Sequence, residues 1–288
     1  MPLVSIVMPT YKPDFFEQAL RSAMGQTYTN IEILVSDNCP TDAIEKICGK
    51  FNGIRYARNA EAGAKNVVGS LYLGTGEFVK PLFDDDILHP FCVEKMQRAI
   101  QLDSSIALVF SASAIIDTNH NKTGIRAPIA ENGMVTGNDL YRHMVLNFIN
   151  IIGELSSVMY RRTAIDKLSQ EDLFKLGARD YTHGLADVVA FKNIIQKKNG
   201  YYLKEELTYF RHDNALSSNS NLSTNKKFVH CVTDWFDLLF QAHDAADITD
   251  QEFINCSTLV ASFTNTWKEI YPVVAEYQSE YLKKISIL

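Results

Sequence analysis

Three consecutive carboxylates, Asp84, Asp85 and Asp86, stand directly after the apolar segment 77–83, and we call them the acidic turn. Like charges repel, so three adjacent aspartates at the end of a predicted strand need a reason. Carboxylate oxygens are ligands that Mg²⁺ and Mn²⁺ prefer, usually one or two carboxylates together with phosphate and water. A helix cap ahead of Pro90 is the alternative, but a cap needs one aspartate rather than three.

Other residues capable of chemistry stand near the ends of predicted elements. Asp37 follows the segment 31–36, where its alternative role is an Asx turn before Pro40. Lys65 lies near the amino-terminus of a predicted helix, where a lysine can meet phosphate or sugar, although a surface loop is the plainer interpretation. Arg211 and His212 end a predicted strand. An arginine can clamp phosphate with two hydrogen bonds and a histidine can bind metal, while ordinary surface positions are the alternative.

Alternating strands and helices would position these residues. Short connections between such elements favour a parallel, doubly wound sheet, in which ligands bind at the carboxyl ends of the strands. Asp37 and the acidic turn both stand at such ends. The hydrophobic periodicity predicts strands over 3–9, 31–36, 54–58 and 77–83, and helices over 14–26, 41–51 and 64–74.

The pattern changes beyond residue 100. Segment 106–117 predicts a strand followed by a turn, segment 188–200 predicts a helix ended by Gly200, and 201–212 predicts two short strands. Three helical segments follow, with aromatic residues at a spacing typical of a core or a subunit interface: Trp235, Phe236, Phe240, Trp267, Tyr271 and Tyr277. We predict one domain over 1–218 and a carboxy-terminal helical region over 219–288.

The composition excludes several classes of protein. With 46% hydrophobic and 22% charged residues the chain is typical of globular proteins, and its formal charge of −6 argues against a nucleic-acid partner. Five scattered cysteines without a CxxC pair favour a reducing cytosol. Segment 1–13 lacks the features of a signal peptide, and no stretch reaches about 18 apolar residues. We expect a cytoplasmic protein, with peripheral association at the inner membrane face left open.

Several motifs, in order, resemble the inverting family 2 glycosyltransferases, which have the GT-A fold. The resemblance covers roughly residues 3–218 and is carried by "VSIVMPTYKP", "LRSAMGQTYTNIEILVSDNCPTD", "NAEAGAKNVVGSLYLGTGEFVKPLFDDDILHP", "LADVVAFKNII" and "YFRHDNALS". The chain departs from the family pattern at four places. Lys12 replaces a common asparagine, residues 38–40 replace Asp-Gly-Ser, Phe83 stands where many members have aspartate, and Ala186 replaces a glutamate.

The resemblance implies a metal-dependent transferase that moves a sugar from a nucleotide sugar to a glycan or lipid-linked acceptor of surface polysaccharide synthesis. A UDP-sugar is the expected donor. A Mn²⁺ or Mg²⁺ ion would stabilise the charge on the leaving diphosphate. The residues that it assigns to the nucleotide are Pro9, Thr10 and Tyr11 on the base, Asp37 on the uracil N3–H, Asp84 on the ribose, and Lys65, Asp85 and Arg211. The metal would be held by Asp85 or Asp86, with Asp85 preferred, and by His212.

The resemblance also implies a general base. Inverting transfer is a single in-line displacement, so one carboxylate must take the proton of the acceptor hydroxyl. Asp187 stands at the start of a predicted helix, where the helix dipole favours the ionised form. Asp180 is the second candidate, and an ordinary first-turn aspartate is the alternative interpretation. The loop through Ser217 and Ser218 is a candidate lid over the donor.

The sequence also bears on three other functions. A sugar-phosphate nucleotidyltransferase needs a Gly-rich, Arg-containing loop after the first strand, where "PTYKP" has no glycine. A NAD-binding protein is disfavoured because no GxGxxG follows a strand. A degenerate transferase that only binds nucleotide or serves as a scaffold stays open because of Ala186 and the altered 38–40 loop. A homodimer through the carboxy-terminal helices is also left open.

Overall fold

The computed structural model describes residues 1–61, 63–212 and 221–288. The chain divides into two compact units. Unit 1 comprises Met1–Thr136, Ile152–Leu173 and Asn193–Asp213, and unit 2 comprises Gly137–Ile151, Phe174–Lys192 and Asn214–Leu288. Unit 2 thus includes two earlier segments of the chain besides the carboxy-terminal helices. The predicted domain boundary at residue 218 lies outside the described residues and stays a prediction.

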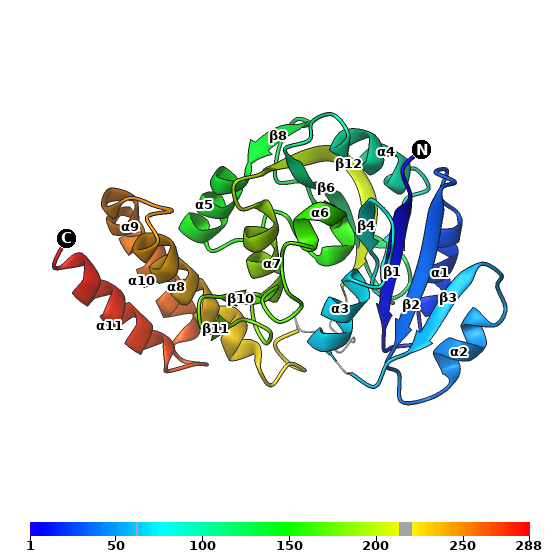
Figure 1. Cartoon of the computed structure of the whole chain (residues 1–288). Coiled ribbons are helices and arrows are strands. Elements are labelled where there is room, and N and C mark those ends of the chain that lie inside the picture. The colour runs from blue at the N-terminus through cyan, green and yellow to red at the C-terminus, as the bar shows by residue number, and fades with distance from the viewer. Residues whose placement is uncertain (62, 213–220) are drawn as a thin grey trace. The chain divides into compact units, whose positions relative to one another are not determined.

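Unit 1 is built on a ten-stranded mixed sheet with the order β3-β2-β1-β4-β9-β6-β12-β5, to which β7 and β8 add at β6 and β12 (Figure 1). Strands β3, β2, β1 and β4 run parallel, as predicted. β9 is antiparallel to both of its neighbours. The strands are β1 (Val4–Thr10), β2 (Ile31–Asp37), β3 (Ile54–Arg58), β4 (Phe78–Pro81), β5 (Ile87–Leu88), β6 (Ile106–Ile116), β7 (Lys122–Arg126), β8 (Gly133–Thr136), β9 (Val158–Arg161) and β12 (Asn199–Arg211).

Helices α1 (Phe16–Met24), α2 (Ala43–Cys48) and α4 (Cys92–Ile100) contribute to one hydrophobic core with the sheet. β1 is buried along its whole length, which explains its mostly apolar sequence. Helix α3 (Ala64–Leu71) contacts β1 and β2. The remaining helical turns of unit 1 are η1 (Leu155–Ser157) and α6 (Arg162–Ile165). The central core residues include Val4, Ile6, Met8, Phe16, Leu20, Ile33, Val35, Ile44, Val93 and Met96.

Two predictions near residue 200 were wrong. Helix α7 (Ala186–Ile195) ends before Gly200, which lies instead within β12. β12 is one continuous strand of 13 residues rather than two short ones. It pairs with β6 on one side and with β8 and β5 on the other, and its register with β6 shifts at Leu203 and Glu206. These long-range pairings, which local periodicity does not record, extend the strand.

Unit 2 is mainly helical. Helix α8 (Phe228–Asp244) contacts α5 (Gly137–Asn147), α9 (Asp250–Asn255) and α11 (Val274–Ile285), and α10 (Ser257–Trp267) contacts α9 and α11. A two-stranded hairpin is formed by β10 (Lys175–Leu176) and β11 (Arg179–Asp180). A capping box at Thr249 begins α9. In the described part of the chain, no helix is both long and apolar enough to cross a membrane.

The aromatic residues of the carboxy-terminal helices pack mainly inside unit 2. Phe148 stacks on Trp235 with ring centroids 5.8 Å apart and lies edge-on to Phe236 at 5.5 Å. Phe236 is fully buried and Phe240 is 6% exposed. A core role is therefore confirmed for Trp235, Phe236 and Phe240, whereas Trp267, Tyr271 and Tyr277 are half-buried. A homodimer through this region stays a prediction.

Candidate functional site

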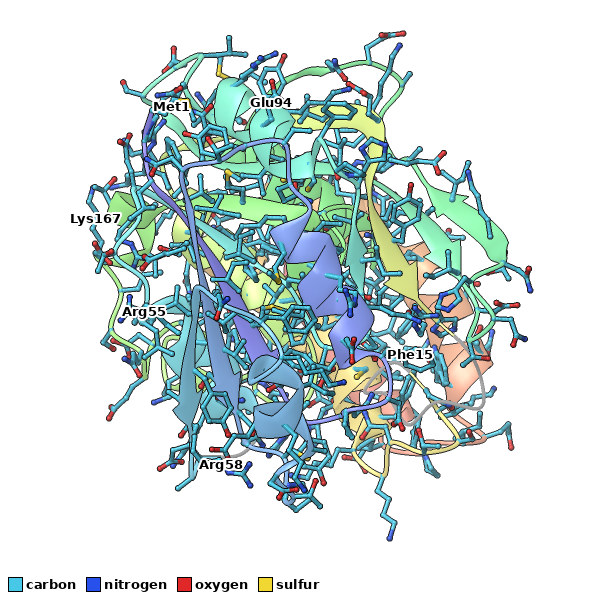
Figure 2. The ribbon with its side chains drawn as sticks, turned by 90° about the vertical axis from the view of Figure 1, so that its right-hand side faces the viewer. Met1, Phe15, Arg55, Arg58, Glu94 and Lys167 are labelled. Atoms are coloured by element: carbon cyan, nitrogen blue, oxygen red, sulfur yellow. The ribbon has the colours of Figure 1, made fainter. Side chains whose placement is uncertain are left out.

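The loops that follow β1, β2 and β4 leave the sheet at one edge, because these three strands are parallel neighbours. Thr10 at the end of β1 is the register partner of Asp37 at the end of β2, which in turn is the partner of Arg58 at the end of β3. Figure 2 shows Arg58 at this edge and Met1 at the opposite end of the strands. This carboxyl edge of unit 1 is where the sequence predicted a ligand site.

The acidic turn is joined directly to the loop after β1. The backbone N–H groups of Tyr11 and Lys12 donate to Oδ2 of Asp84 at 2.6 and 2.7 Å. Asp84 is only 7% exposed, and burial raises the pKa of its carboxyl group to about 6, with repulsion from Asp85 adding to the effect. The two backbone donors oppose that shift without cancelling it. Asp84 therefore fixes the loop at the mouth of the site, and its contact with ribose stays a prediction.

Asp86 is the most deeply held member of the acidic turn. Its Oδ1 accepts a hydrogen bond of 3.1 Å from the backbone N–H of Arg211, and it is 2% exposed. Burial raises the pKa of Asp86 well above its ordinary value, and the nearby Asp85 and Glu154 add to that shift. Asp86 thus anchors the turn to β12, and its predicted role as a metal ligand stays a prediction.

Asp85 is the half-buried member of the acidic turn. Its side chain is 19% exposed, and its Oδ2 lies 3.4 Å from Nζ of Lys12. The hard oxygen donors of Asp85 fit Mn²⁺ or Mg²⁺ chemically. The described residues contain no group of three or more His, Cys, Asp or Glu side chains arranged to hold a metal. An ion at Asp85 would therefore complete its coordination with phosphate and water, which is common for Mg²⁺.

Arg211 takes part in the internal structure of unit 1. Its Nε donates to the carbonyl of Asp85 at 3.0 Å, and its Nη1 donates to the carbonyl of Asp117 at 2.7 Å. Its Cζ lies 4.0 Å from the ring centroid of Phe15, which is labelled in Figure 2. The guanidinium is thus directed at protein groups. Its predicted contact with phosphate, and the predicted metal contact of the exposed His212, stay predictions.

Asp37 closes the loop that follows β2. Its carboxylate is fully buried and accepts from the backbone N–H of Cys39 at 2.7 Å, the hydroxyl of Tyr56 at 2.8 Å and Nη1 of Arg58 at 2.7 Å. These three donors give Asp37 a structural role at the edge of the sheet. The predicted hydrogen bond to uracil stays a prediction and would have to use the carboxylate's remaining acceptor capacity.

The other predicted nucleotide contacts differ in exposure. Pro9 and Thr10 are buried in β1, whereas Tyr11 is 55% exposed beyond its end. The ammonium of Lys65 lies 3.1 Å from Glu61 on an exposed surface. The neighbouring Asn66, which sequence reasoning missed, is buried and donates to the carbonyl of Ser36 at 2.9 Å. A polar residue on the apolar face of a predicted helix was the feature of the sequence that could have identified Asn66.

A buried charged network supports the acidic turn from within unit 1. Lys80 is fully buried, its ammonium donates to the carbonyls of Pro81 and Ser156, and burial lowers its pKa. Arg126 donates to Oε1 of Glu154 at 2.7 Å. Gly153, with φ of 95°, permits that contact, because a Cβ there would lie 2.2 Å from Cζ of Arg126.

Asp187 lies in unit 2, in the first turn of α7, as predicted. Its Oδ2 accepts a hydrogen bond of 2.7 Å from the amide of Asn150, and its Oδ1 accepts one of 2.8 Å from the backbone N–H of Val188. The carboxylate is half-buried and its direction is fixed. Asp180, the second candidate, is exposed and accepts from the backbone N–H of Thr182 at 2.8 Å. The choice of base stays a prediction.

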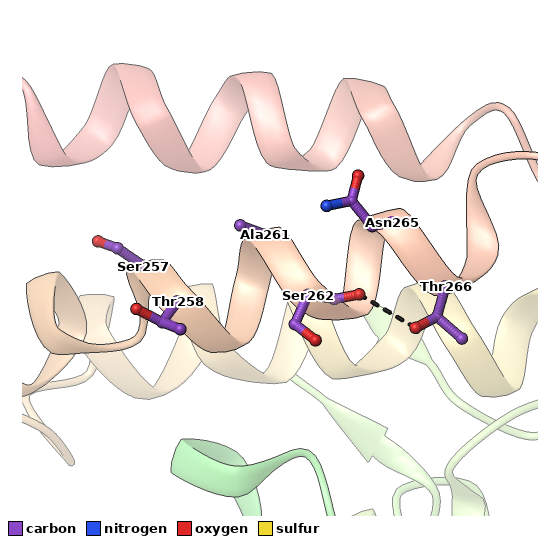
Figure 3. Close-up of a pocket in the computed structure, with 6 residues that line it drawn as sticks. All are labelled: Ser257, Thr258, Ala261, Ser262, Asn265 and Thr266. Atoms are coloured by element: carbon purple, nitrogen blue, oxygen red, sulfur yellow. Dashed lines mark hydrogen bonds between the residues drawn. The ribbon is translucent and has the colours of Figure 1, made fainter.

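Two further features are the candidate lid and a hollow beside α10. The candidate lid at Ser217 and Ser218 lies outside the described residues. A hollow of about 700 Å³ runs along α10, where the hydroxyl of Thr266 donates to the carbonyl of Ser262 (Figure 3). None of its lining residues is titratable, so it offers no acid–base chemistry: Ser257, Thr258, Ala261, Ser262, Asn265 and Thr266.

Comparison with known proteins agrees with this class of fold. Residues 5–169, more than half of the chain, match the model of Glycosyl transferase family 2. The chain therefore belongs to glycosyl transferase family 2, and the predicted family is confirmed. An uncharacterized glycosyltransferase of Rickettsia typhi is 31% identical over 121 residues, which cover 40% of this chain and 38% of that protein.

A second relative has a named activity. The UDP-Glc:alpha-D-GlcNAc-diphosphoundecaprenol beta-1,3-glucosyltransferase of Escherichia coli is 33% identical over 125 residues, which cover 41% of this chain and 48% of that enzyme. The chain thus spans less than half the length of these two relatives.

Among solved structures, TarS 1-349 of S. aureus in complex with UDP-GlcNAc superposes with a TM-score of 0.66. The match covers 99% of this chain and 82% of TarS, at 15% sequence identity. At that identity the likeness shows the fold alone, and it confirms the predicted GT-A type of fold.

Proposed function

We propose that this protein is a metal-dependent inverting glycosyltransferase that moves a sugar from a UDP-sugar to a hydroxyl of a glycan or lipid-linked acceptor. The proposal rests on one observation in a chain of this family. The acidic turn is hydrogen-bonded to the loop after β1, beside the end of β2, at the carboxyl edge of unit 1. The named donor and acceptor of the Escherichia coli relative support the choice of substrates. Surface polysaccharide synthesis at the cytoplasmic side of a membrane is the corresponding process.

The residues of the chain would share the work as follows. Asp85 would hold Mn²⁺ or Mg²⁺ with its half-buried carboxylate, and Asp84 would orient the ribose. The ion, when bound, supplies positive charge against the charge that develops on the leaving diphosphate. Asp187 would take the proton of the acceptor hydroxyl, since the amide of Asn150 and the N–H of Val188 hold its carboxylate in a fixed direction.

The experiment measures UDP release from a panel of UDP-sugars with Mn²⁺, with free sugars and lipid-linked sugars as acceptors. Wild type is compared with Asp85→Ala, and UDP affinity is measured by calorimetry in parallel. We expect acceptor-dependent UDP release by the wild type and loss of Mn²⁺-dependent UDP binding in Asp85→Ala. Unchanged affinity in that variant would reject the metal assignment.

A degenerate transferase without activity is the second candidate, because Ala186 replaces the glutamate usual before the base. UDP binding by the wild type without turnover of any donor and acceptor would favour it. A sugar-phosphate nucleotidyltransferase is disfavoured by the family match.

A further inference from the structure

Lys12 places a positive charge against the acidic turn. Its backbone N–H donates to Oδ2 of Asp84 at 2.7 Å, so the residue is fixed at the carboxyl edge of the sheet. Its ammonium lies 3.4 Å from Oδ2 of Asp85, with the two side chains 32% and 19% exposed. A cation of the chain itself therefore lies at the carboxylate that would hold the metal.

Two other cations near this edge, Arg211 and Arg58, are held by the protein in a different way. Arg211 is 3% exposed, and its guanidinium donates to the carbonyls of Asp85 and Asp117. Arg58 donates to the buried carboxylate of Asp37 and to the carbonyls of Thr41 and Cys39. Lys12 differs because its charge is on a compact head group at the end of a long flexible stem. It can leave Asp85 without breaking the backbone hydrogen bond that fixes its position.

We propose that Lys12 competes with the divalent ion for Asp85 and, once displaced, binds the diphosphate of the nucleotide. This inference rests on the function proposed above. An ammonium group has three donors and no lone pair, so it cannot be a metal ligand and must give way when an ion binds Asp85. Its charge and donors then suit phosphate oxygens, which carry the negative charge that the bound nucleotide brings to the site.

The proposal predicts two effects of opposite sign from one substitution. Lys12→Gln removes the competitor, so the protein without nucleotide should bind Mn²⁺ more tightly, by about three- to tenfold for a partly exposed ion pair. The same substitution removes a cation for the diphosphate, so UDP measured in EDTA should bind about three- to tenfold more weakly. A purely structural role for Lys12 would weaken both affinities together.

The test titrates Mn²⁺ into the protein of residues 1–288 by electron paramagnetic resonance of the unbound ion, and titrates UDP by calorimetry in EDTA. Lys12→Arg should retain the UDP affinity because it keeps the charge. Lys50→Gln is the matched control, since Lys50 pairs with Glu17 at 2.7 Å on an exposed surface of the same unit. We expect the control to behave like the wild type in both titrations.

Three outcomes decide the question. Opposite shifts in Lys12→Gln, with an unchanged melting temperature, support the inference. An unchanged or weaker Mn²⁺ affinity, or an unchanged UDP affinity in EDTA, overturns it while leaving the proposed function intact if the wild type binds UDP with Mn²⁺. A wild type that binds UDP under neither condition overturns both.

Discussion

Replacing Asp84 with asparagine should stabilise unit 1 at neutral pH and have little effect near pH 4. Burial raises the pKa of Asp84 from 3.8 to about 6 in the folded protein. The folded state therefore binds the proton more tightly than the unfolded state. Ionised Asp84 thus lowers the free energy of unfolding, and this destabilisation is absent below pH 3.8 and complete above about pH 6. Two pKa units correspond to about 3 kcal/mol, which we take as an upper value.

Asparagine keeps the shape of Asp84 and removes its charge. Both backbone donors, from Tyr11 and Lys12, bind the same carboxylate oxygen, and the single amide oxygen of asparagine can accept both. We therefore expect the free energy of unfolding to rise by about 1–3 kcal/mol at pH 8 in Asp84→Asn, with the gain vanishing as the pH falls to about 4.

The assay is urea unfolding of wild type and Asp84→Asn in EDTA, at several pH values between 4 and 8. Asp166→Asn is the control, because this exposed carboxylate lies 3.8 Å from its ion-pair partner Arg162, a long contact. It should show no comparable gain that depends on pH. Destabilisation by Asp84→Asn of equal size at both ends of the range would refute the reasoning.

Three further substitutions test the site and its support. Asp187→Asn should retain UDP affinity and lose about 100-fold or more in the rate of transfer, so full turnover would exclude this base. Gly153→Ala should lower stability by about 1–3 kcal/mol in thermal unfolding, because its methyl group meets Arg126 at a backbone φ of 95°; an unaltered melting temperature would contradict that packing. Asp37→Ala should cost about 3 kcal/mol in urea unfolding, because it leaves the buried N–H of Cys39 without its acceptor and removes the partner of Tyr56. A loss below about 1 kcal/mol would argue against the structural role of Asp37.

The amino-terminal part of the fold follows from local sequence. β1 is buried on both faces, so most of its residues are apolar. Parallel pairing places the residues after β1, β2 and β4 at one edge. The structure adds that Asp84 and the loop after β1 are joined there by hydrogen bonds. The same rule could have found Arg58, which ends a correctly predicted strand.

The later part of the fold depends on contacts between distant segments. β12 is defined by its pairing with β6, β8 and β5, none of which is near it in sequence. The contacts of Arg211 with Asp85 and Phe15 likewise join residues more than a hundred positions apart. A single sequence gives the type of such a residue but not its partner. An arginine that binds phosphate therefore cannot be distinguished by sequence from one that binds other parts of the protein.

The most direct test of the central claim is a crystal soaked with UDP and Mn²⁺, examined by anomalous scattering at the manganese edge. We predict a manganese peak between the carboxylate of Asp85 and the diphosphate, with Asp86 still bonded to the backbone of Arg211. Clear density for UDP at the carboxyl edge of unit 1 without a manganese peak near Asp85 would contradict the claim.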